Sequence, residues 1–387
     1  MDLNPKKTIR LAKSTVGPAE AQAVARVLLE DGYLGMGREV QAFEEELAAF
    51  LGVPEERVIC VNSGTAALHL AVEAVTQPGD EVLVQSLTYV ATFQAISGAR
   101  AVPVPCEVLP ETLTLDLNDA RQRLTPRTRA VMPVHYASNP GNLKAVYDFA
   151  RRHGLKVIED AAHAFGCRYR GRLIGSEGDV VCFSFDGIKN ITSGEGGAVV
   201  TADAALARRV RDARLLGVEK DTARRYAGQR SWEFEVSHQG YRYHLSNVLA
   251  AIGRVQLKRF PLEFAPRRVG LARLYRRRLA ELPFVGLFDT DLDQVVPHLQ
   301  PVRVLNGQRD GLRDFLDKEG IETGVHYRPN HLLKFYGGGQ VRLPLTERLY
   351  SELLSLPLHP ELTEAEVNRI CDRIAAFGEN QKKGAGL

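Results

Sequence analysis

Cysteine is scarce in this sequence, and its placement argues against two kinds of small-protein architecture. The 387 residues contain five cysteines, an odd number, and no two of them form a CxxC pair. A disulfide framework needs paired cysteines and a structural zinc site needs clustered ones, so we expect neither and predict no metal site. Cys60 and Cys182 lie inside apolar runs, and we expect both to be buried as small hydrophobic side chains.

Long apolar runs and an excess of one charge are also missing. No run of about 18 apolar residues occurs, which argues against a membrane span. The first 14 residues have no apolar core of the kind that a signal peptide has, so we expect a cytoplasmic protein. Fifty Lys and Arg against 47 Asp and Glu leave a formal charge of +3, which argues against a nucleic-acid partner. A basic pocket for a small anion stays compatible with this balance.

Short apolar runs alternate with helical patterns over residues 57–216. The candidate strands are Arg57–Val61, Glu81–Val84, Arg100–Val104, Ala130–Val134, Leu155–Glu159, Val180–Phe185 and Ala198–Thr201. Continuous apolar runs are typical of strands that are buried in a parallel sheet. The pattern predicts an α/β fold with a mostly parallel sheet flanked by helices. Ligands of such sheets bind beyond the carboxyl ends of the strands, so we look for chemistry there.

The remainder of the chain changes character twice. Residues 217–244 are polar, basic and aromatic without a clear period, and we interpret them as a long, functional loop. A helical pattern with many arginines follows from 246 to 281, and shorter strands and helices continue to about 377. We therefore predict a large domain over 1–245, a smaller α+β domain over 246–377 and a disordered tail over 378–387.

The first segment that can carry chemistry is Val61–Leu68. An apolar strand ends there, a turn of small residues follows, and a helix begins. The N–H groups and the dipole at the start of a helix favour an anion such as phosphate, and Gly64 and Thr65 lie at this position. A Ser-Gly-Thr sequence is also a good helix cap, so this segment alone leaves both interpretations open.

The second segment is Val157–His163, in which Glu159 and Asp160 end an apolar strand. Successive side chains of a strand point to opposite faces, so these two carboxylates cannot face one ligand. A carboxylate at this edge can hold a proton on a ring nitrogen, as pyridoxal 5′-phosphate (PLP) requires of its enzymes. Acidic pairs also end strands in nucleotide and metal sites, and the segment alone does not decide between them.

The third segment is Ser184–Gly197, which follows a buried strand and places Lys189 among glycines. An amine that loses solvent and gains cationic neighbours has a lowered pKa and can form a Schiff base. Ser184 is close enough in sequence to contact the phosphate of a cofactor held there. A surface lysine in a glycine loop is the alternative that composition leaves open.

Together, these segments resemble the DegT/DnrJ/EryC1/StrS aminotransferases, a PLP-dependent family of fold type I that acts on sugars. The similarity runs from about residue 8 to 377. The matching segments are Ser14, Gly17–Pro18, Asp31–Gly35, Gly37, Phe43–Glu45, Asn62–Leu68, Glu159–His163, Ser184–Gly197, Gly320–Tyr327 and Leu356–Pro360. Their order and number make the resemblance specific. It implies a mostly parallel seven-stranded sheet with a smaller C-terminal α+β domain.

The resemblance also implies roles in catalysis and cofactor binding. Lys189 is expected to form the Schiff base with PLP and to move the proton during transamination. Asp160 is expected to pair with the pyridinium nitrogen, and His163 to lie near the ring oxygen. The residues expected to hold the phosphate are Gly64, Thr65 and Ser184. Tyr89 matches the aromatic residue that stacks on the PLP ring, with a buried aromatic at a helix start as the alternative.

Family members are homodimers that share active sites between subunits. The resemblance therefore implies that the loop at 218–244 reaches the neighbouring subunit's site. Many relatives have asparagine where this chain has Arg242, which leaves the partner's phosphate contact open. An arginine at this position can make a charge-assisted contact instead.

The acceptor side of the site is expected in the segment His326–Tyr336 and at Asp186. His326, Tyr327 and His331 are the candidate substrate residues of that segment. Its spacing is more similar to the transaminase of 4-amino-4-deoxy-arabinose synthesis than to perosamine synthases. Asp186 stands where some relatives have histidine, so we expect a different acceptor preference.

The resemblance implies transfer of an amino group from L-glutamate, or glutamine, to a nucleotide-linked keto-sugar. A 4-keto-6-deoxyhexose is the first expectation, for the synthesis of amino sugars in surface polysaccharides such as O-antigen or in glycosides. A keto-pentose or a cyclitol ketone is the alternative acceptor. The alternative reaction is sugar dehydration, which Lys189 argues against because dehydratases of the family commonly carry histidine there. A non-catalytic dimeric module is disfavoured by the presence of both Lys189 and Asp160.

Overall fold

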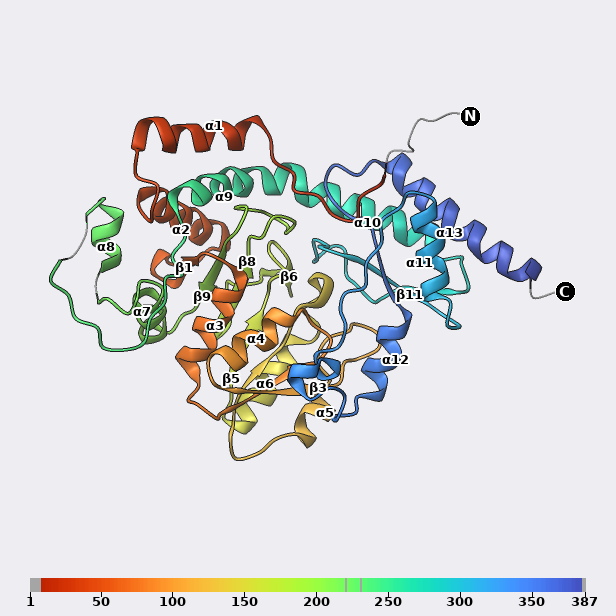
Figure 1. Ribbon diagram of the computed structural model, residues 1–387, viewed down its shortest axis with the longest axis horizontal. Coiled ribbons are helices and arrows are strands. Elements are labelled where there is room, and N and C mark those ends of the chain that lie inside the picture. Colours follow the sequence, from red (N-terminus) through yellow and green to blue (C-terminus); the bar gives the residue numbers. More distant parts are fainter. Residues whose placement is uncertain (1–7, 220, 230–231, 385–387) are drawn as a thin grey trace.

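A seven-stranded sheet forms the centre of the molecule in a computed structural model, which describes residues 8–219, 221–229 and 232–384 (Figure 1). Its order is β1-β9-β8-β5-β4-β2-β3. The strands are β1 (Val58–Val61), β2 (Glu81–Gln85), β3 (Val102–Cys106), β4 (Thr128–Met132), β5 (Lys156–Asp160), β8 (Val180–Ser184) and β9 (Gly197–Val200). Each candidate strand of the sequence is found, with ends shifted by at most two residues.

The sheet is parallel from β3 to β8 and antiparallel only where β9 pairs with β8 and β1. The predicted mostly parallel α/β fold is thus confirmed. Residues on both faces are buried, which explains the continuous apolar runs. In β1, for example, Val58 and Cys60 pack in one apolar cluster while Ile59 and Val61 pack in another on the opposite face.

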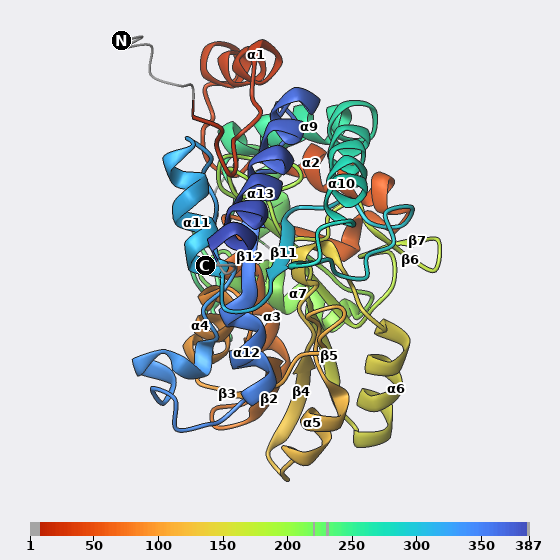
Figure 2. The same ribbon diagram turned by 90° about the vertical axis from the view of Figure 1, so that its right-hand side faces the viewer.

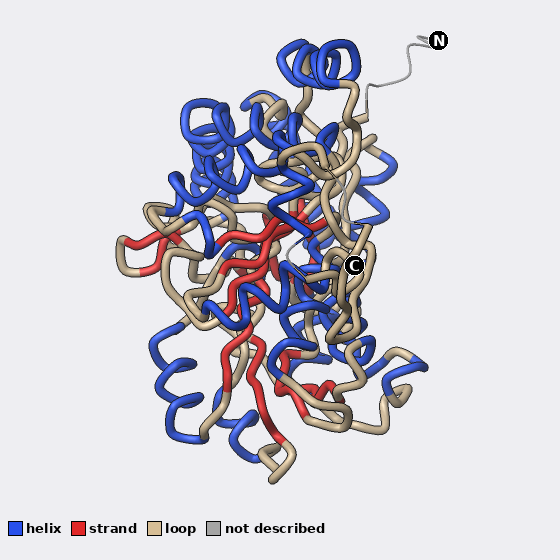
Figure 3. Tube along the Cα trace, turned by 90° about the vertical axis from the view of Figure 1, so that its left-hand side faces the viewer, coloured by secondary structure: helices blue, strands red, loops and turns tan. Residues whose placement is uncertain are grey.

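Helices lie on both faces of this sheet, and the strands form a band between them in Figure 3. The α-helices of the whole structure are α1 (Pro18–Arg26), α2 (Arg38–Leu51), α3 (Gly64–Val75), α4 (Val90–Gly98), α5 (Leu117–Gln122), α6 (Leu143–His153), α7 (Ala204–Ala213), α8 (Asp221–Tyr226), α9 (Asn247–Arg259), α10 (Ala265–Leu279), α11 (Arg309–Lys318), α12 (Pro344–Glu352) and α13 (Glu364–Gly384). Among the described residues, no helix has the length and apolar character that crossing a bilayer needs.

A second, antiparallel sheet lies to one side of the first (Figures 1 and 2). It consists of β10 (Val285–Gly286), β11 (Gln300–Val304) and β12 (Leu353–Leu356), and a short hairpin is formed by β6 (Arg168–Tyr169) and β7 (Arg172–Leu173). Helices α10, α11 and α13 share an apolar cluster with this second sheet. Ile9, near the start of the chain, also packs there and pairs with Ile321.

Two segments differ from a simple reading of the sequence. Helix α13 continues over 378–384, so the predicted disordered tail is wrong for these residues. Glutamate, glutamine and lysine in this stretch of sequence favour a helix. Residues 385–387 lie outside the described residues. The long loop at 217–244 contains the short helix α8, which stands out from the body of the molecule in Figure 1. Cys60 and Cys182 are buried, as expected.

A buried charged cluster fastens this loop to the large sheet. The Arg214 guanidinium, which is inaccessible to solvent, donates to Glu44 Oε1 at 2.5 Å and to the Cys60 carbonyl at 2.6 Å. It also donates to the Tyr226 hydroxyl at 2.9 Å, and that hydroxyl donates to the second oxygen of Glu44. Helices α2 and α8 and strand β1 thus meet around one guanidinium. The Glu44 carboxylate would have no cationic partner in this cluster without it.

We predict that Arg214→Met lowers the free energy of unfolding by about 3–5 kcal/mol, because it leaves the Glu44 carboxylate buried without its partner. The measurement is urea denaturation followed by circular dichroism. Lys144→Ala, which breaks the exposed pair with Asp148, serves as the control and should change stability by less than about 1 kcal/mol. Equal effects of the two substitutions would contradict the prediction.

Candidate active site

The start of α3, at Gly64 and Thr65, lies against Ser184 at the end of β8, and we call these three residues the anion cup. Ser63 caps the helix, since its Oγ accepts from the Ala66 N–H at 3.0 Å, and α3 begins at Gly64. A Cβ on Gly64 would lie 2.7 Å from the Cβ of Ser184, so only glycine lets the two strand ends approach so closely. The sequence left a helix cap and an anion site as alternatives. They are compatible, because the cap uses the Ser63 hydroxyl and the Ala66 N–H, whereas an anion would use the N–H groups at Gly64 and Thr65. Thr65 is exposed at the mouth of the cup.

Glu159 and Asp160 point to opposite faces of β5, as their alternation predicted. Glu159 lies 3.0 Å from His135 Nε2 and accepts from the Tyr147 hydroxyl at 2.6 Å. Asp160 instead accepts from the Thr92 hydroxyl at 2.8 Å and from the Ala162 N–H at 3.2 Å. Only Asp160 therefore lies on the side of the sheet that carries Thr92 and α4.

The Asp160 carboxylate is buried beside a cation. Burial raises the pKa of Asp160 above its usual value, against the lowering effects of the Thr92 and Ala162 hydrogen bonds and of the charges at Lys189 and His135. A carboxylate in this position is stabilised by a further positive donor, such as a protonated ring nitrogen. The donor set is thus suited to hold a cationic heterocycle.

Lys189 lies in the loop after β8, where its backbone N–H donates to the Asp186 carbonyl at 3.0 Å. Burial lowers the pKa of Lys189 to about 8, and the cationic Arg268 lowers it as well, while Asp186 and Asp160 act in the opposite direction. A substantial fraction of the amine is therefore unprotonated near neutral pH. An unprotonated lysine amine is both a nucleophile and a base.

His163 lies between two rings on the floor of the site. Its Nε2 is 3.2 Å from the Tyr327 hydroxyl, and its ring centroid is 4.5 Å from that of His298. Burial holds the pKa of His163 well below its usual range, so the ring is neutral. Its Nδ1 has no hydrogen-bond partner among the described residues, which leaves a buried polar atom for a ligand.

Tyr89 sits at the start of α4 with 57% of its surface exposed. Its ring lies 5.4 Å from that of Tyr327, at an angle of 49°. The buried alternative for Tyr89 is therefore not what the structure has. An open aromatic face beside Asp160 and Thr92 is available for a flat ring.

Two of the expected acceptor residues lie close to this group. His326 Nδ1 is 2.8 Å from the Ser355 hydroxyl, and burial lowers the pKa of His326 to about 4 with a further lowering by Lys189. Tyr327 follows it and contacts His163 and Tyr89. Asp186 is partly buried, and its Oδ1 accepts from the Ile188 N–H at 3.3 Å.

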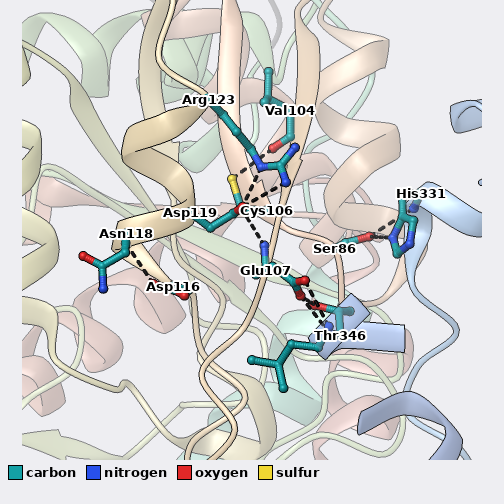
Figure 4. A network of polar contacts seen from close by, with 11 residues as sticks. Ser86, Val104, Cys106, Glu107, Asp116, Asn118, Asp119, Arg123, His331 and Thr346 are labelled. Carbon is teal, nitrogen blue, oxygen red and sulfur yellow. Dashed lines mark hydrogen bonds and ion pairs between the residues drawn. The ribbon is translucent and has the colours of Figure 1, made fainter. Parts of the chain in front are cut away.

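The structure does not bring His331 to the same surface. Its ring is completely buried, with Nδ1 2.8 Å from the Ser86 hydroxyl (Figure 4) and Nε2 3.4 Å from Glu347. Both ring nitrogens thus have protein partners. The spacing of the segment identified the residue, but spacing cannot show that the 3₁₀ turn Asn330–Leu332 directs it inward.

The backbone of Arg242 lies next to Asn62, close to the anion cup. The Asn62 N–H donates to the Tyr243 carbonyl at 2.7 Å, and the Asn62 side chain donates to the Arg242 carbonyl at 3.4 Å. The Arg242 side chain is exposed. The structure thus brings the Arg242 backbone to Asn62, two residues before Gly64, and leaves its side chain exposed.

Sequence reasoning missed two residues of the site, Thr92 and His298. Thr92 lies three residues after Tyr89, but no sequence signal joins its hydroxyl to a carboxylate 68 positions away. His298 lies in the irregular stretch before β11 and showed no motif. Its backbone N–H donates to Ser138 Oγ at 2.8 Å, which fixes the ring against His163.

The arrangement agrees with comparisons to solved structures. DesV from S. venezuelae, solved in complex with a ketimine intermediate, has a TM-score of 0.84 and 39% identity, covering 93% of this chain and 94% of that one. Spr1654 from Streptococcus pneumoniae, solved in its PLP form, has a TM-score of 0.88 and 26% identity, covering 96% and 99%. Fold and site together define an aminotransferase of fold type I.

The sequence comparisons agree with this class. The model of the DegT/DnrJ/EryC1/StrS aminotransferase family matches residues 15–375. The dTDP-4-dehydro-2,3,6-trideoxy-D-glucose 4-aminotransferase of Saccharopolyspora spinosa is 37% identical over 371 residues, which cover 94% of this chain and 95% of that protein. The chain therefore belongs to the DegT/DnrJ/EryC1/StrS aminotransferase family, as the resemblance predicted.

The environment of Lys189 predicts an unusual pH dependence of its reactivity. Modification of Lys189 by an amine reagent in the cofactor-free protein should rise with pH through a midpoint near 8, because burial lowers the pKa of this amine to about 8. Asp186→Asn should move the midpoint to lower pH, since the Asp186 charge raises that pKa. Peptide mass spectrometry measures both, with the exposed Lys156 as an internal reference. A midpoint near 10 would contradict the prediction.

Proposed function

We propose that this protein is a PLP-dependent aminotransferase that moves the amino group of L-glutamate to C4 of a nucleotide-linked 4-keto-deoxyhexose. The observation that carries the proposal is the meeting of a lysine whose pKa is lowered, a buried carboxylate and an anion cup at neighbouring strand ends. Family membership supports the reaction class. The products are 2-oxoglutarate and a 4-amino sugar, so the reaction needs no further oxidant or reductant.

The residues present fit PLP by their chemistry. The cup at Gly64, Thr65 and Ser184 suits a phosphate, because it combines a helix N-terminus with a hydroxyl and excludes a Cβ. The buried Asp160 suits a protonated pyridine nitrogen, and Lys189 suits the aldehyde. When bound, PLP supplies a conjugated ring that stabilises negative charge on the carbon next to the transferred nitrogen.

Lys189 and Asp160 then have distinct tasks. Lys189 Nζ, uncharged in a substantial fraction of molecules near pH 8, takes the proton from Cα of glutamate and later returns a proton on the acceptor side. Asp160 keeps the ring nitrogen protonated through a charge-assisted hydrogen bond. Since both groups are shielded from water, their mutual electrostatic effect is larger than it would be at the surface.

Tyr89, His163 and the acceptor residues complete the proposed site. The exposed ring of Tyr89 would pack against the cofactor ring and keep water from it. The free Nδ1 of His163 suits a hydrogen bond to the ring oxygen. Asp186, His326 and Tyr327 face the sugar, while His331 supports their segment from beneath. The name of the Saccharopolyspora relative supports a dTDP-linked acceptor with the ketone at C4.

We also propose that the protein works as a homodimer in which the loop at 217–244 reaches the neighbouring subunit. Trp232, Phe234 and Val236 expose 85%, 54% and 53% of their surfaces and lie within five consecutive residues. A group of exposed apolar side chains of this kind is typical of a protein interface. Arg242 in this loop is available to contact a phosphate with its charge.

An absorbance spectrum tests the cofactor and the donor together. The purified protein, reconstituted with PLP, should show the visible band of the lysine-bound cofactor, and L-glutamate should convert it to the amine form. Dialysed protein should then aminate dTDP-linked 4-keto sugars, with UDP- and GDP-linked sugars as comparisons. The transaminase proposal fails if no visible band forms after incubation with PLP.

Lys189→Ala should lower the rate of transamination by at least about 100-fold, the usual size of the loss of a positioned acid–base group. The far-ultraviolet circular dichroism should remain that of the wild type. Lys156→Ala, at an exposed position in β5, is the matched control and should keep wild-type turnover. A Lys189→Ala protein with full activity would show that another group performs the proton transfer.

Asp160→Asn should retain PLP but lower turnover on the order of 100-fold, because an amide cannot stabilise the charge of the ring nitrogen. The glutamate half-reaction, followed by stopped-flow absorbance, measures this loss without the sugar. Glu159→Gln, on the opposite face of the same strand, should leave the half-reaction rate closer to that of the wild type. If Glu159→Gln slowed the half-reaction more than Asp160→Asn did, Asp160 would not be the partner of the ring nitrogen.

A further inference from the structure

The segment between β2 and α4 places two buried threonine hydroxyls in line with Asp160. Thr92 Oγ1 lies 2.8 Å from Asp160 Oδ2, and Thr88 Oγ1 lies 2.9 Å from Thr92 Oγ1. Thr88 and Thr92 expose 2% and 1% of their surfaces. An ionised carboxylate only accepts, so the Thr92 proton points at Asp160 and Thr88 donates to Thr92. The ionised Asp160 thereby sets the donor direction in this chain, from Thr88 to Thr92 to Asp160.

We propose that Thr92, supported by Thr88, is a positioning residue that keeps the Asp160 carboxylate ionised and directed at the cofactor's ring nitrogen. The inference rests on the proposed function and deepens it. With Oδ2 bonded to Thr92 and Oδ1 to the Ala162 N–H, the carboxylate cannot rotate without breaking one of the two bonds. A fixed carboxylate presents its remaining lone pairs in one direction, which is what an in-plane bond to a ring nitrogen requires.

The charge balance around Asp160 gives the hydroxyl its importance. Burial works against the ionised form, and the Thr92 hydrogen bond is the largest of the effects that oppose it. The other groups that act on Asp160 are Lys189 after β8, His135 after β4 and the Ala162 N–H. The Tyr327 hydroxyl and the Cys182 thiol also interact electrostatically with it. Lys189 loses its charge when it acts as a nucleophile, whereas the hydroxyl remains a donor throughout.

The threonine pair is itself held from the C-terminal part of the chain. Asn330 Nδ2 donates to the carbonyls of Ser86 and Thr88, at 3.1 and 2.8 Å. Ser86 Oγ contacts His331 Nδ1 (Figure 4), and the Asn330 N–H donates to the Ser86 carbonyl at 2.9 Å. These fully buried contacts fix the turn that carries Thr88, Tyr89 and Thr92, so the direction of the Asp160 carboxylate depends on it.

The test uses pyridoxine 5′-phosphate, which has the ring nitrogen and the phosphate of PLP but no aldehyde for Lys189. Its binding to the full-length, cofactor-free protein is measured by calorimetry between pH 5 and pH 8, roughly the range in which folded proteins are most stable. The ionised form of Asp160 is required, so binding weakens as pH falls through the pKa of this group. Loss of a stabilising hydrogen bond raises that pKa and moves the acid limb to higher pH.

Thr92→Val should move the acid limb upward by about one pH unit, so that at a pH below both limbs it binds about tenfold more weakly than the wild type, since one unit corresponds to a factor of ten. Thr92→Ser keeps the hydroxyl and should stay within about twofold of the wild type in both. Thr88→Val should shift the limb in the same direction by a smaller amount, and it provides the test if Thr92→Val does not fold. The glutamate half-reaction should slow in the same order.

Thr76→Val is the matched control, because it removes a buried hydroxyl whose partner among the described residues is the Val72 carbonyl at the far end of α3. It should leave the affinity and its pH dependence unchanged. If the wild type binds and transaminates while Thr92→Val has the same acid limb, the positioning role is refuted and the proposed function stands. If the wild type binds neither pyridoxine 5′-phosphate nor PLP, the proposed function fails and the inference fails with it.

Discussion

The parallel pairing of β5 with β8 is the interaction on which the site depends. It sets Asp160 opposite Cys182, so that Asp160 lies next to the residues that lead through Ser184 to Lys189. On the far side of β8, β9 runs antiparallel and brings β1 in, which places Gly64 against Ser184. Three segments that are far apart in the chain thereby end at one edge. A one-residue slip between β5 and β8 would turn Asp160 to the face that now holds Glu159.

Burial at this edge acts against the charged form of four ionisable groups. It raises the pKa of Asp160 and lowers the pKa values of Lys189, His163 and His326. The histidines are therefore neutral hydrogen-bonding groups, and the charges that remain are concentrated on Lys189 and Asp160. A ligand with a cationic ring nitrogen compensates the carboxylate, and one with an anionic phosphate matches the helix terminus.

The sequence was sufficient for those parts of this arrangement that follow from local periodicity. Apolar runs located all seven strands of the large sheet, and the alternation of side chains correctly separated Glu159 from Asp160. Parallel order then directed attention to the residues beyond the strand ends, and the family resemblance implied that Lys189 and Asp160 serve one cofactor there. The contacts that no pattern announced are those between distant side chains. Thr92 meets Asp160 across 68 positions, and His298 meets His163 from a stretch without regular structure.

His331 shows why spacing alone misplaces a residue. Histidine is equally suited to bind a substrate and to join two buried hydrogen-bonding groups, and a sequence presents both in the same way. The outcome depended on Ser86, which follows β2 and supplies the partner for Nδ1. Helix α13 is a smaller case, in which helix-forming residues outweighed the position near the end of the chain.

The segment that carries His326 and Tyr327 is joined to the large sheet at two separate points. Ser86 and His331 form one, and the Glu107 carboxylate forms the other by accepting from the Leu345 and Thr346 N–H groups at the start of α12 (Figure 4). A carboxylate at a helix N-terminus is favourably placed with respect to the dipole. Between these points the chain crosses Lys334–Tyr336 and three glycines with positive φ. Asp160 and Lys189 therefore follow the neighbouring strands β5 and β8, whereas His326 and Tyr327 lie on a separate segment that precedes the first of these attachment points. Substitutions in that segment can alter the proposed acceptor contacts while Asp160 and Lys189 keep their places, which accounts physically for a single fold serving many sugars.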